Sequence, residues 1–237
     1  MSVQEHVQAV QEKVAAAARA ADRALEEITL CAATKVQTDE TIRQAIAAGV
    51  RVCGENRVQE LTAHLAADAY AGAQVHFIGH LQTNKVKQVV GKVDLIHSVD
   101  SDRLLQAIQN QAEKLGICQD ILLEINIAGE ESKGGIPPAQ ARQLAAQAMA
   151  LPNVRLRGLM AIPPISTTPG ENRQFFAAMR QLFVDMKEEM AHNQSEFNCL
   201  SMGMSGDYED AIAEGATLIR VGTALFGPRP PMGGAQK

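Results

Sequence analysis

The chain has 237 residues, of which 46% are hydrophobic and only 3% aromatic, so its core must be built mainly from aliphatic side chains. That is enough apolar material for a sizeable core without metals or disulfides. The net charge of −5 excludes a broad nucleic-acid-binding face, although backbone N–H groups can still hold a phosphate locally.

Targeting and cysteine patterns indicate a cytoplasmic protein. Charged residues interrupt the opening segment, which argues against a signal peptide, and no segment is apolar enough to span a membrane. The four cysteines, Cys31, Cys53, Cys118 and Cys199, are widely spaced and include no CxxC pair. We therefore expect reduced core thiols rather than a metal site. Nothing in the sequence demands an oligomer, and we expect a monomer.

A helix is predicted at the start, where Val3, Val7, Val10 and Val14 recur at helical spacing. We expect this segment, residues 1–25, to pack against the rest of the fold. Strands and helices then alternate. The predicted strands are 28–34, 50–54, 75–79, 94–99, 120–127, 154–162, 197–202 and 217–222. The predicted helices are 39–48, 56–69, 84–90, 101–115, 137–150, 171–191 and 207–214.

This alternation predicts a single (β/α)8 TIM-type barrel of the α/β class with an extra N-terminal helix. A doubly wound sheet is the alternative, but it needs a glycine-rich turn after the first strand, where Lys35-Val36-Gln37-Thr38 stands instead. We expect one domain over residues 1–237, with a flexible tail at 228–237. The Pro-rich segment 162–171 reads as a mobile barrel loop rather than a domain boundary.

Lys35 directly follows the first predicted strand. Active groups of such barrels lie at the carboxyl ends of the strands, so this lysine would project into the mouth of the barrel. A partly desolvated amine has a lowered pKa and can attack a carbonyl group. The alternative is an ordinary solvated lysine at a strand end.

The last two strand ends form a predicted phosphate cradle. Ser205 and Gly206 stand in a turn between strand and helix, and Gly222 and Thr223 follow the final strand. Phosphates in barrels commonly bind at these two loops through backbone N–H groups. The alternative interpretation is that Ser205 and Asp207 simply cap the following helix.

A nucleophilic lysine with a phosphate cradle suits two kinds of ligand. One is a sugar phosphate, as in a Schiff-base aldolase, and the other is pyridoxal 5′-phosphate (PLP). Arg220 separates them, because a pyridine nitrogen needs a partner, and an arginine would bind it while leaving it unprotonated. A plain strand arginine remains the alternative.

At these residues the sequence resembles the pyridoxal-phosphate homeostasis proteins, relatives of the barrel domain of alanine racemase. The resemblance covers nearly the whole chain and rests on seven segments in order. They are EITLCAATK ending at Lys35, GENRVQE at 54–60, HFIGHLQTNK at 76–85, ESKGGI at 131–136, RGLMAI at 157–162, LSMGMS at 200–205 and IRVGTALFG at 219–227.

The resemblance implies a fold-type III PLP barrel in which Lys35 holds the cofactor as a Schiff base and Arg220 lies beside the pyridine nitrogen. It places Ser205, Gly222 and Thr223 around the phosphate, with Asn56 and Met204 as neighbours of the ring or the phosphate. It implies no catalytic residue and no metal.

The resemblance also implies a carrier or regulator of PLP with no established reaction, whose recipients would be PLP-dependent apo-enzymes. Lys133 could relay the cofactor to another protein. The second function is an amino-acid racemase. It needs another acid–base residue opposite the lysine, which the related racemases take from a further domain, and the sequence continues for only fifteen residues after Gly222. An aldolase is the third function.

Overall fold

Eight parallel strands close into a barrel in the computed structural model, which describes residues 2–130, 133–166, 168–190 and 196–227. Each strand pairs with its neighbour in sequence, and β1 pairs with β8. The strands are β1 (Thr29–Ala33), β2 (Val52–Glu55), β3 (Gln74–Phe77), β4 (Leu95–Val99), β5 (Gln119–Glu124), β6 (Val154–Met160), β7 (Cys199–Ser201) and β8 (Leu218–Val221). The predicted barrel is confirmed. The predicted tail at 228–237 lies outside the described residues.

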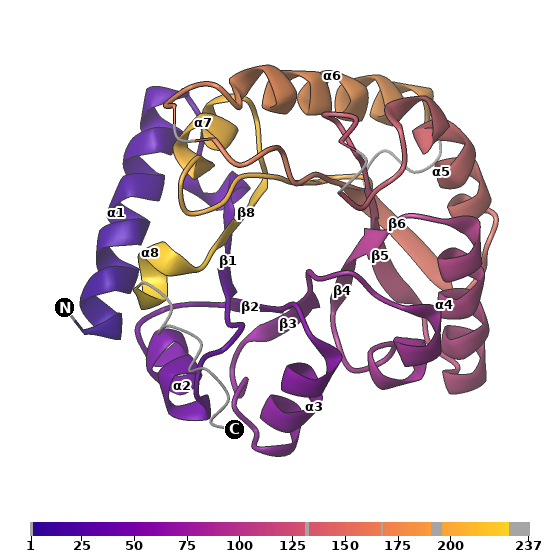
Figure 1. Ribbon diagram of the computed structural model, residues 1–237, viewed down its shortest axis with the longest axis horizontal. Coiled ribbons are helices and arrows are strands. Elements are labelled where there is room, and N and C mark those ends of the chain that lie inside the picture. Colours follow the sequence, from indigo (N-terminus) through magenta and orange to yellow (C-terminus); the bar gives the residue numbers. More distant parts are fainter. Residues whose placement is uncertain (1, 131–132, 167, 191–195, 228–237) are drawn as a thin grey trace, which may run out of the picture.

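Helices surround the barrel on its outside (Figure 1). The α-helices are α1 (Val3–Ala20), α2 (Asp39–Ala47), α3 (Val58–Ala66), α4 (Asp102–Leu115), α5 (Ala141–Met149), α6 (Arg173–Glu189), α7 (Tyr208–Ala213) and α8 (Thr223–Phe226). Short 3₁₀ helices are η1 (Leu25–Glu27), η2 (Thr83–Gln88) and η3 (Pro138–Gln140). The predicted helix at 84–90 is thus a 3₁₀ segment, and α8 is too short to show a periodicity in the sequence.

Local signals explain where several elements begin and end. The hydroxyls of Thr38 and Ser101 accept the N–H groups of Thr41 and Leu104 at the starts of α2 and α4. Gly116 ends α4 in the left-handed region, with φ of 65°. Helix α1 buries its valine stripe and packs beside α7, α8 and α2, which confirms the extra N-terminal helix (Figure 1).

The prediction for the fifth strand was too long. Strand β5 ends at Glu124, because Ile125 forms an isolated bridge with Ile136 and the N–H of Asn126 donates to the Ile136 carbonyl at 2.9 Å. The loop after β5 therefore folds back on its own strand. Residues 125–127, which were predicted to extend the strand, belong to this loop instead.

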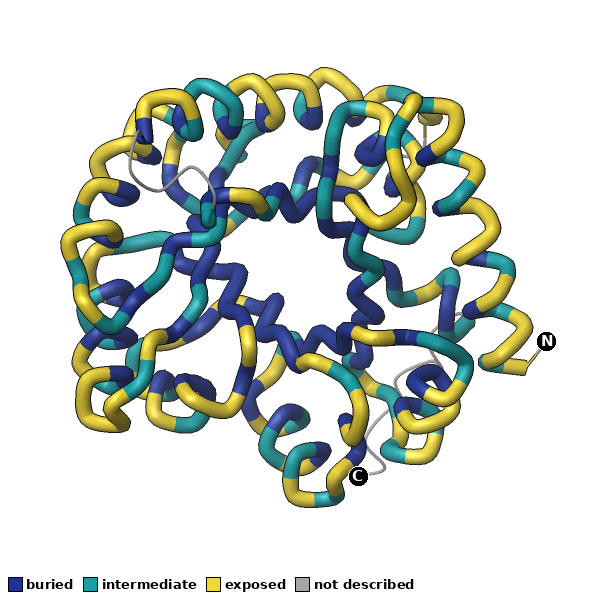
Figure 2. Tube along the Cα trace, turned by 180° about the vertical axis from the view of Figure 1, so that it is seen from behind, coloured by how far each residue is buried: buried dark blue, intermediate teal, exposed yellow. Residues whose placement is uncertain are grey.

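Alternate strand residues point toward the barrel axis and fill its interior. Two aliphatic clusters lie there, formed by Cys31, Ala33, Val52, Ile78 and Leu218 and by Leu95, Leu122 and Met160. Figure 2 shows the strands as a buried ring inside largely exposed helices. Two residues beyond Ala33 and Leu122, the same alternation brings Lys35 and Glu124 to the carboxyl end of the barrel.

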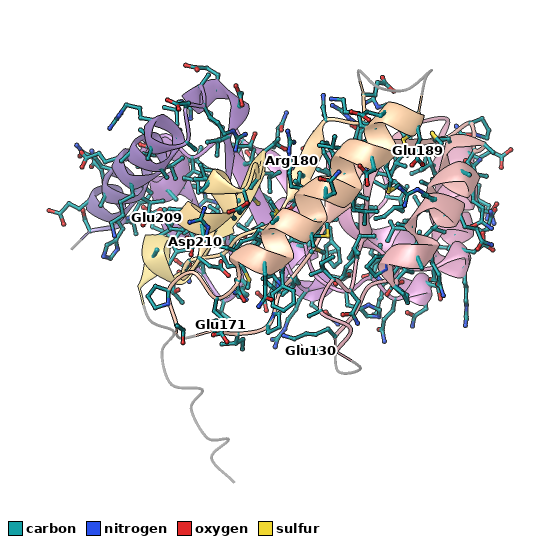
Figure 3. The ribbon with its side chains drawn as sticks, turned by 90° about the horizontal axis from the view of Figure 1, so that it is seen from above. Glu130, Glu171, Arg180, Glu189, Glu209 and Asp210 are labelled. Atoms are coloured by element: carbon teal, nitrogen blue, oxygen red, sulfur yellow. The ribbon has the colours of Figure 1, made fainter. Side chains whose placement is uncertain are left out.

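That end carries the longer loops. Glu130 follows β5 and Glu171 follows β6, and both lie at one edge of the barrel in Figure 3. Helix α6 starts near this edge and runs to Glu189 at the other (Figure 3). We call the first edge the carboxyl mouth and the second the amino mouth.

Candidate functional site

The predicted site residues come from four consecutive strands of the closed barrel, β7, β8, β1 and β2. Cys31 is paired with Arg220 across β1 and β8, and Ala33 with Gly54 across β1 and β2. A methyl group added at Gly222 would lie 3.5 Å from the Ala33 side chain. The fold thus brings Lys35, Asn56, Met204, Ser205, Arg220, Gly222 and Thr223 to neighbouring strands or strand ends.

Lys35 lies half-buried in a tight turn after β1. The N–H of Gln37 donates to the Thr34 carbonyl at 3.0 Å, and Val36 adopts a positive φ of 59°. A β-branched residue is rare in this region, so the turn carries backbone strain. The N–H of Val36 donates to Glu60 Oε2 at 2.8 Å, and this contact from α3 holds the turn in place.

A buried acid supports the same turn from behind. The Thr34 hydroxyl donates to Glu55 Oε1 at 2.6 Å, and Glu55 is fully buried. Burial raises the pKa of Glu55, while the hydrogen bond from Thr34 opposes that rise. His64 lies between this carboxyl and Asp39, with Nε2 3.9 Å from Glu55 Oε1 and Nδ1 2.5 Å from Asp39 Oδ1. The turn that carries Lys35 is therefore supported by a network of polar contacts through Thr34, Glu55 and His64.

Arg220 is a buried cation, with 4% of its surface exposed. Its Nη1 donates to Ser201 Oγ at 2.5 Å and its Nη2 to the Ala161 carbonyl at 2.9 Å. Burial lowers the pKa of the guanidinium. In the part of the chain that the structure describes, no carboxylate lies within ion-pair distance of it. A buried charge without a counterion is costly, so this group is suited to an acceptor from a ligand.

Ser205 joins the turns after β7 and β8. Its hydroxyl oxygen accepts the N–H groups of Gly222 and Ala224 at 3.0 and 3.3 Å. Asp207 begins α7, yet its side chain makes no cap bond; it accepts the N–H of Met204 at 2.7 Å instead. The capping alternative for Ser205 and Asp207 is therefore wrong. Two amide donors converge on one oxygen, as they do in an anion cradle.

The loop at 162–171 is tied to this cradle. Asn172 donates from Nδ2 to Asp207 Oδ2 at 2.8 Å, and the N–H of Gly170 donates to Asp210 Oδ2 at 3.2 Å. A cavity of about 320 Å³ lies between the loop and the turn at Ser205. The predicted mobility of the loop stays a prediction. The contacts of Gly170 and Asn172 reach Asp210 and Asp207, which follow Ser205 closely in the chain.

Asn56 directly follows β2, on the same side of the barrel as these groups. Its Oδ1 is buried without a hydrogen-bond partner, which marks it as an acceptor with spare capacity. Any side chain at Gly79 would overlap the Asn56 carbonyl, at 2.1 Å, so only glycine fits there. Met204 is half-buried and Thr223 exposed at the same end. Gly79 therefore allows the GENR and FIGH segments to approach each other closely.

Sequence reasoning missed the residues that support Lys35 and Arg220. Glu55 and Glu60 stand in the GENRVQE segment, but nothing in the pattern says which side chain reaches the lysine turn. The sequence pattern also gave no reason to single out His97, although it lies inside the barrel with Nδ1 3.1 Å from Ser201 Oγ. Its strand alternation with Leu95 could have placed it on the axis; the partner from β7 could not have been read from the sequence.

Two further properties of the described residues limit the chemistry. None of their helices has both the length and the apolar character needed to cross a bilayer. No group of three or more His, Cys, Asp or Glu side chains among them is arranged to hold a metal ion.

Comparison with known proteins gives consistent results. The family described as alanine racemase, N-terminal domain, matches residues 6–230. A pyridoxal phosphate homeostasis protein of Aquifex aeolicus is 43% identical over 233 residues, covering 97% of this chain and 99% of the relative. The protein of that name in Escherichia coli K12 is 40% identical and covers 93% and 94% of the two chains.

A solved structure shares the fold closely. PipY of Synechococcus elongatus, determined with PLP bound, superposes with a TM-score of 0.82 at 35% identity. The match covers 95% of this chain and all of PipY (100%).

Proposed function

Because this chain belongs to the alanine racemase N-terminal domain family, and relatives along its whole length are named pyridoxal phosphate homeostasis proteins, we propose that it binds PLP and acts in PLP homeostasis. Its role is that of a carrier or regulator of the cofactor. The observation that carries the proposal is Arg220, a buried cation without a carboxylate partner among the described residues, on the strand next to the one that leads to Lys35.

The residues at the carboxyl mouth fit the three polar parts of PLP. Bound PLP supplies an aldehyde that bonds to a lysine amine and a ring that can withdraw electrons. Lys35 would provide the amine for a Schiff base. The turns at Ser205, Gly222 and Thr223, where the N–H groups of Gly222 and Ala224 converge on Ser205 Oγ, would hold the phosphate. Asn56 and Met204 flank the ring or the phosphate.

Arg220 favours holding the cofactor over transforming an amino acid. An arginine donates hydrogen bonds and does not give up its proton at ordinary pH. Beside the ring nitrogen it would leave that nitrogen unprotonated. The ring then withdraws electrons weakly, which suits storage and release.

A racemase is less well supported, because it needs a second acid–base group opposite the lysine. The sequence contains two tyrosines, Tyr70 and Tyr208, and both are buried, with 5% and 4% exposed. Burial raises the pKa of each hydroxyl. Neither is suited to act as a base. An aldolase acting on a sugar phosphate would leave Arg220 without a ring nitrogen to bind.

The finer points of the proposal concern the state of the protein. We propose that the chain forms one domain, acts as a monomer and delivers PLP to PLP-dependent apo-enzymes. Free thiols at Cys31, Cys53, Cys118 and Cys199 support a reducing, cytoplasmic location. Lys133, half-buried in the loop after β5, keeps its suggested role in transfer. Unchanged transfer by a Lys133→Ala variant would contradict that role.

The test is the visible spectrum of the purified protein before and after borohydride reduction, followed by peptide mass mapping. We expect a yellow band that reduction removes, with the pyridoxyl mass on the peptide containing Lys35. Transfer of PLP to an apo-enzyme and the absence of racemisation then support a carrier. A colourless protein that added PLP cannot load contradicts the proposal and favours a sugar phosphate.

A further inference from the structure

A chain of polar side chains runs through the barrel interior from Arg220 toward the amino mouth. Ser201 Oγ accepts from Arg220 Nη1 at 2.5 Å and lies 3.1 Å from His97 Nδ1. His97 Nε2 lies 3.0 Å from His76 Nδ1. All four side chains are buried, and they come from β8, β7, β4 and β3.

The donors and acceptors of these groups favour one direction for the chain. Arginine only donates, so Ser201 accepts from Arg220 and its own hydroxyl proton is left for His97 Nδ1. His97 then carries its proton on Nε2 and donates it to His76 Nδ1. His76 in turn carries its proton on Nε2, and its ring borders the cavity at the amino mouth.

Both imidazoles are neutral at physiological pH, as this direction requires. Burial lowers the pKa of His76 to about 4. Burial also lowers the pKa of His97 well below its ordinary value, and His76 and Arg220 lower it further. A neutral histidine has one donor and one acceptor nitrogen. With His97 protonated on Nε2 every link is made and the Ser201 hydroxyl proton has an acceptor, whereas the reversed tautomers would leave that proton without an acceptor in the chain.

We propose that Ser201, His97 and His76 are positioning residues that hold the Arg220 guanidinium in place for the ring nitrogen of PLP. The inference rests on the proposed function. The rest of the barrel interior is aliphatic at comparable positions such as Leu95, Leu122 and Leu218, which fill space without polar groups. A buried polar chain costs stability unless it is fully satisfied. This one ends on Arg220.

The charges around Arg220 leave the guanidinium in need of such support. Glu124 from β5 and Asp207 from the turn after β7 face it electrostatically, as do the thiols of Cys31 and Cys199. None of these groups forms an ion pair with it. Within the described chain, Ser201 and the Ala161 carbonyl are the acceptors that fix its orientation.

Two serine variants separate positioning from general packing. Ser201→Ala removes the hydroxyl that Arg220 binds, whereas Ser98→Ala removes a fully buried hydroxyl on β4 that has no hydrogen-bond partner. We expect Ser201→Ala to weaken PLP binding about tenfold, or about 1.4 kcal/mol, and to shift the visible absorption maximum of the loaded protein. Ser98→Ala should change neither. His97→Asn should have a smaller effect than Ser201→Ala, and His76→Gln a smaller one still.

Several outcomes overturn the inference. A Ser201→Ala protein that melts earlier but keeps the wild-type PLP affinity and spectrum would show a structural role only. Ser201→Thr keeps the hydroxyl and should restore affinity and absorption to near wild-type; failure of that rescue also contradicts positioning. If the wild-type protein binds no PLP, the proposed function falls and this inference with it. If the wild type loads with PLP and the Ser201, His97 and His76 variants keep its affinity and spectrum, the positioning role is wrong and the proposed function stands.

A measurement on the wild-type protein tests the chain without any substitution. Nitrogen NMR of the histidine side chains reports which ring nitrogen carries the proton. We expect the Nε2–H tautomer at both His97 and His76. A proton on Nδ1 of His97, or a charged ring at neutral pH, contradicts the direction of the chain even if every variant misfolds.

Discussion

The two mouths of the barrel treat charge in opposite ways. At the amino mouth, Asp120 accepts from Arg155 Nε at 2.6 Å and from Arg157 Nη1 at 2.8 Å, and Glu196 lies 3.6 Å from Arg155. At the carboxyl mouth, Arg220 has no carboxylate within ion-pair distance among the described residues. At the amino mouth these charges are in ion pairs, whereas at the carboxyl mouth Arg220 has no carboxylate partner among the described residues and the Oδ1 of Asn56 accepts no hydrogen bond.

This difference supports the proposed PLP site at the carboxyl mouth better than cavity size does. The amino mouth contains a cavity of about 700 Å³, larger than the one of about 320 Å³ beside Ser205. Its arginines are already bound to Asp120, so little is gained by bringing in a ligand charge. At the carboxyl mouth, Arg220 and the Oδ1 of Asn56 gain from a ligand. The ion pairs at the amino mouth contribute to folding stability, whereas the groups at the carboxyl mouth are available to bind a ligand.

The largest expected effect is on PLP loading, from Lys35→Ala. Without the amine the cofactor loses its covalent anchor, and we expect loading to fall at least 100-fold and the borohydride-stable label to vanish. The side chain is half-buried at the mouth, so we expect the free energy of unfolding to fall by no more than the roughly 1 kcal/mol typical of a single substitution. Absorption spectra and urea titrations of the same preparations give both numbers.

A matched control is Lys114→Ala, since Lys114 is exposed in the last turn of α4. It should leave both loading and stability unchanged. If the Lys35→Ala protein carries the pyridoxyl label on a different lysine to the same extent as the wild type, Lys35 is not the anchor of the cofactor. In that case the contrast between the two mouths would lose its functional meaning.

At the amino mouth, Asp120→Ala should do the reverse. It removes the carboxylate that Arg155 and Arg157 share and leaves Arg155 only its longer contact with Glu196. Because the Asp120 side chain is 14% exposed, we expect a loss of about 2 kcal/mol in the free energy of unfolding. PLP loading should be unchanged. Urea titration with a spectrum of the loaded protein checks both, and a large loss of PLP affinity would contradict the division between the mouths.

The exposed pair Arg142–Glu189 supplies the control for this loss. Its side chains are 47% and 53% exposed, so Glu189→Ala should cost less than about 1 kcal/mol. Equal losses of unfolding free energy in Asp120→Ala and Glu189→Ala would mean that partial burial does not strengthen the ion pairs of Asp120. The charge network there would then be an ordinary surface feature.

The sequence predicted the carboxyl mouth better than the amino mouth, for a physical reason. Strand ends, glycines and a lysine are local features, and alternation along each strand puts Lys35 and Arg220 inside the barrel. Asp120 is paired with Arg155 across β5 and β6, but it also reaches Arg157, and the register of the two strands shifts between Ile121 and Leu122. No local pattern encodes such a shift, so which arginines meet which acid could not be predicted.

The same limit applies within the site. Ser205 was expected near the phosphate, and its contacts with Gly222 and Ala224 agree with the predicted neighbourhood of the two turns. The role of Asp207 was not foreseen, because its carboxylate binds Met204 and Asn172 rather than its own helix. Helix-capping rules describe a helix in isolation, whereas here a loop from another strand competes for the carboxylate.

A smaller effect is expected at the turn that carries Lys35. Val36 has a positive φ of 59° and is 51% exposed, so Val36→Gly removes backbone strain and little packing. We expect a gain of about 1 kcal/mol in the free energy of unfolding, since the strain relieved exceeds the entropy cost of glycine. Val36→Ala keeps the Cβ and should gain less. A destabilised Val36→Gly protein in urea titrations would contradict strain at this mouth.

The smallest effect concerns Glu124, which is 7% exposed at the carboxyl mouth. Burial raises the pKa of its carboxyl, and Asp100 raises it further. In the unfolded chain the group ionises near its ordinary value of about 4.3. Folding therefore favours the protonated form, and the stability this contributes is full below that value and is lost as pH rises through the folded pKa.

Glu124→Gln resembles the protonated form and does not titrate, so it should match the wild type near pH 4.5 and exceed it in stability at pH 8. Urea midpoints at the two pH values measure the difference, and Glu113→Gln, at an exposed position on α4, is the control that should show none. A difference that does not grow with pH would mean that Glu124 ionises freely in the folded protein. The case for a ligand at the carboxyl mouth would then rest on Arg220 and the Oδ1 of Asn56.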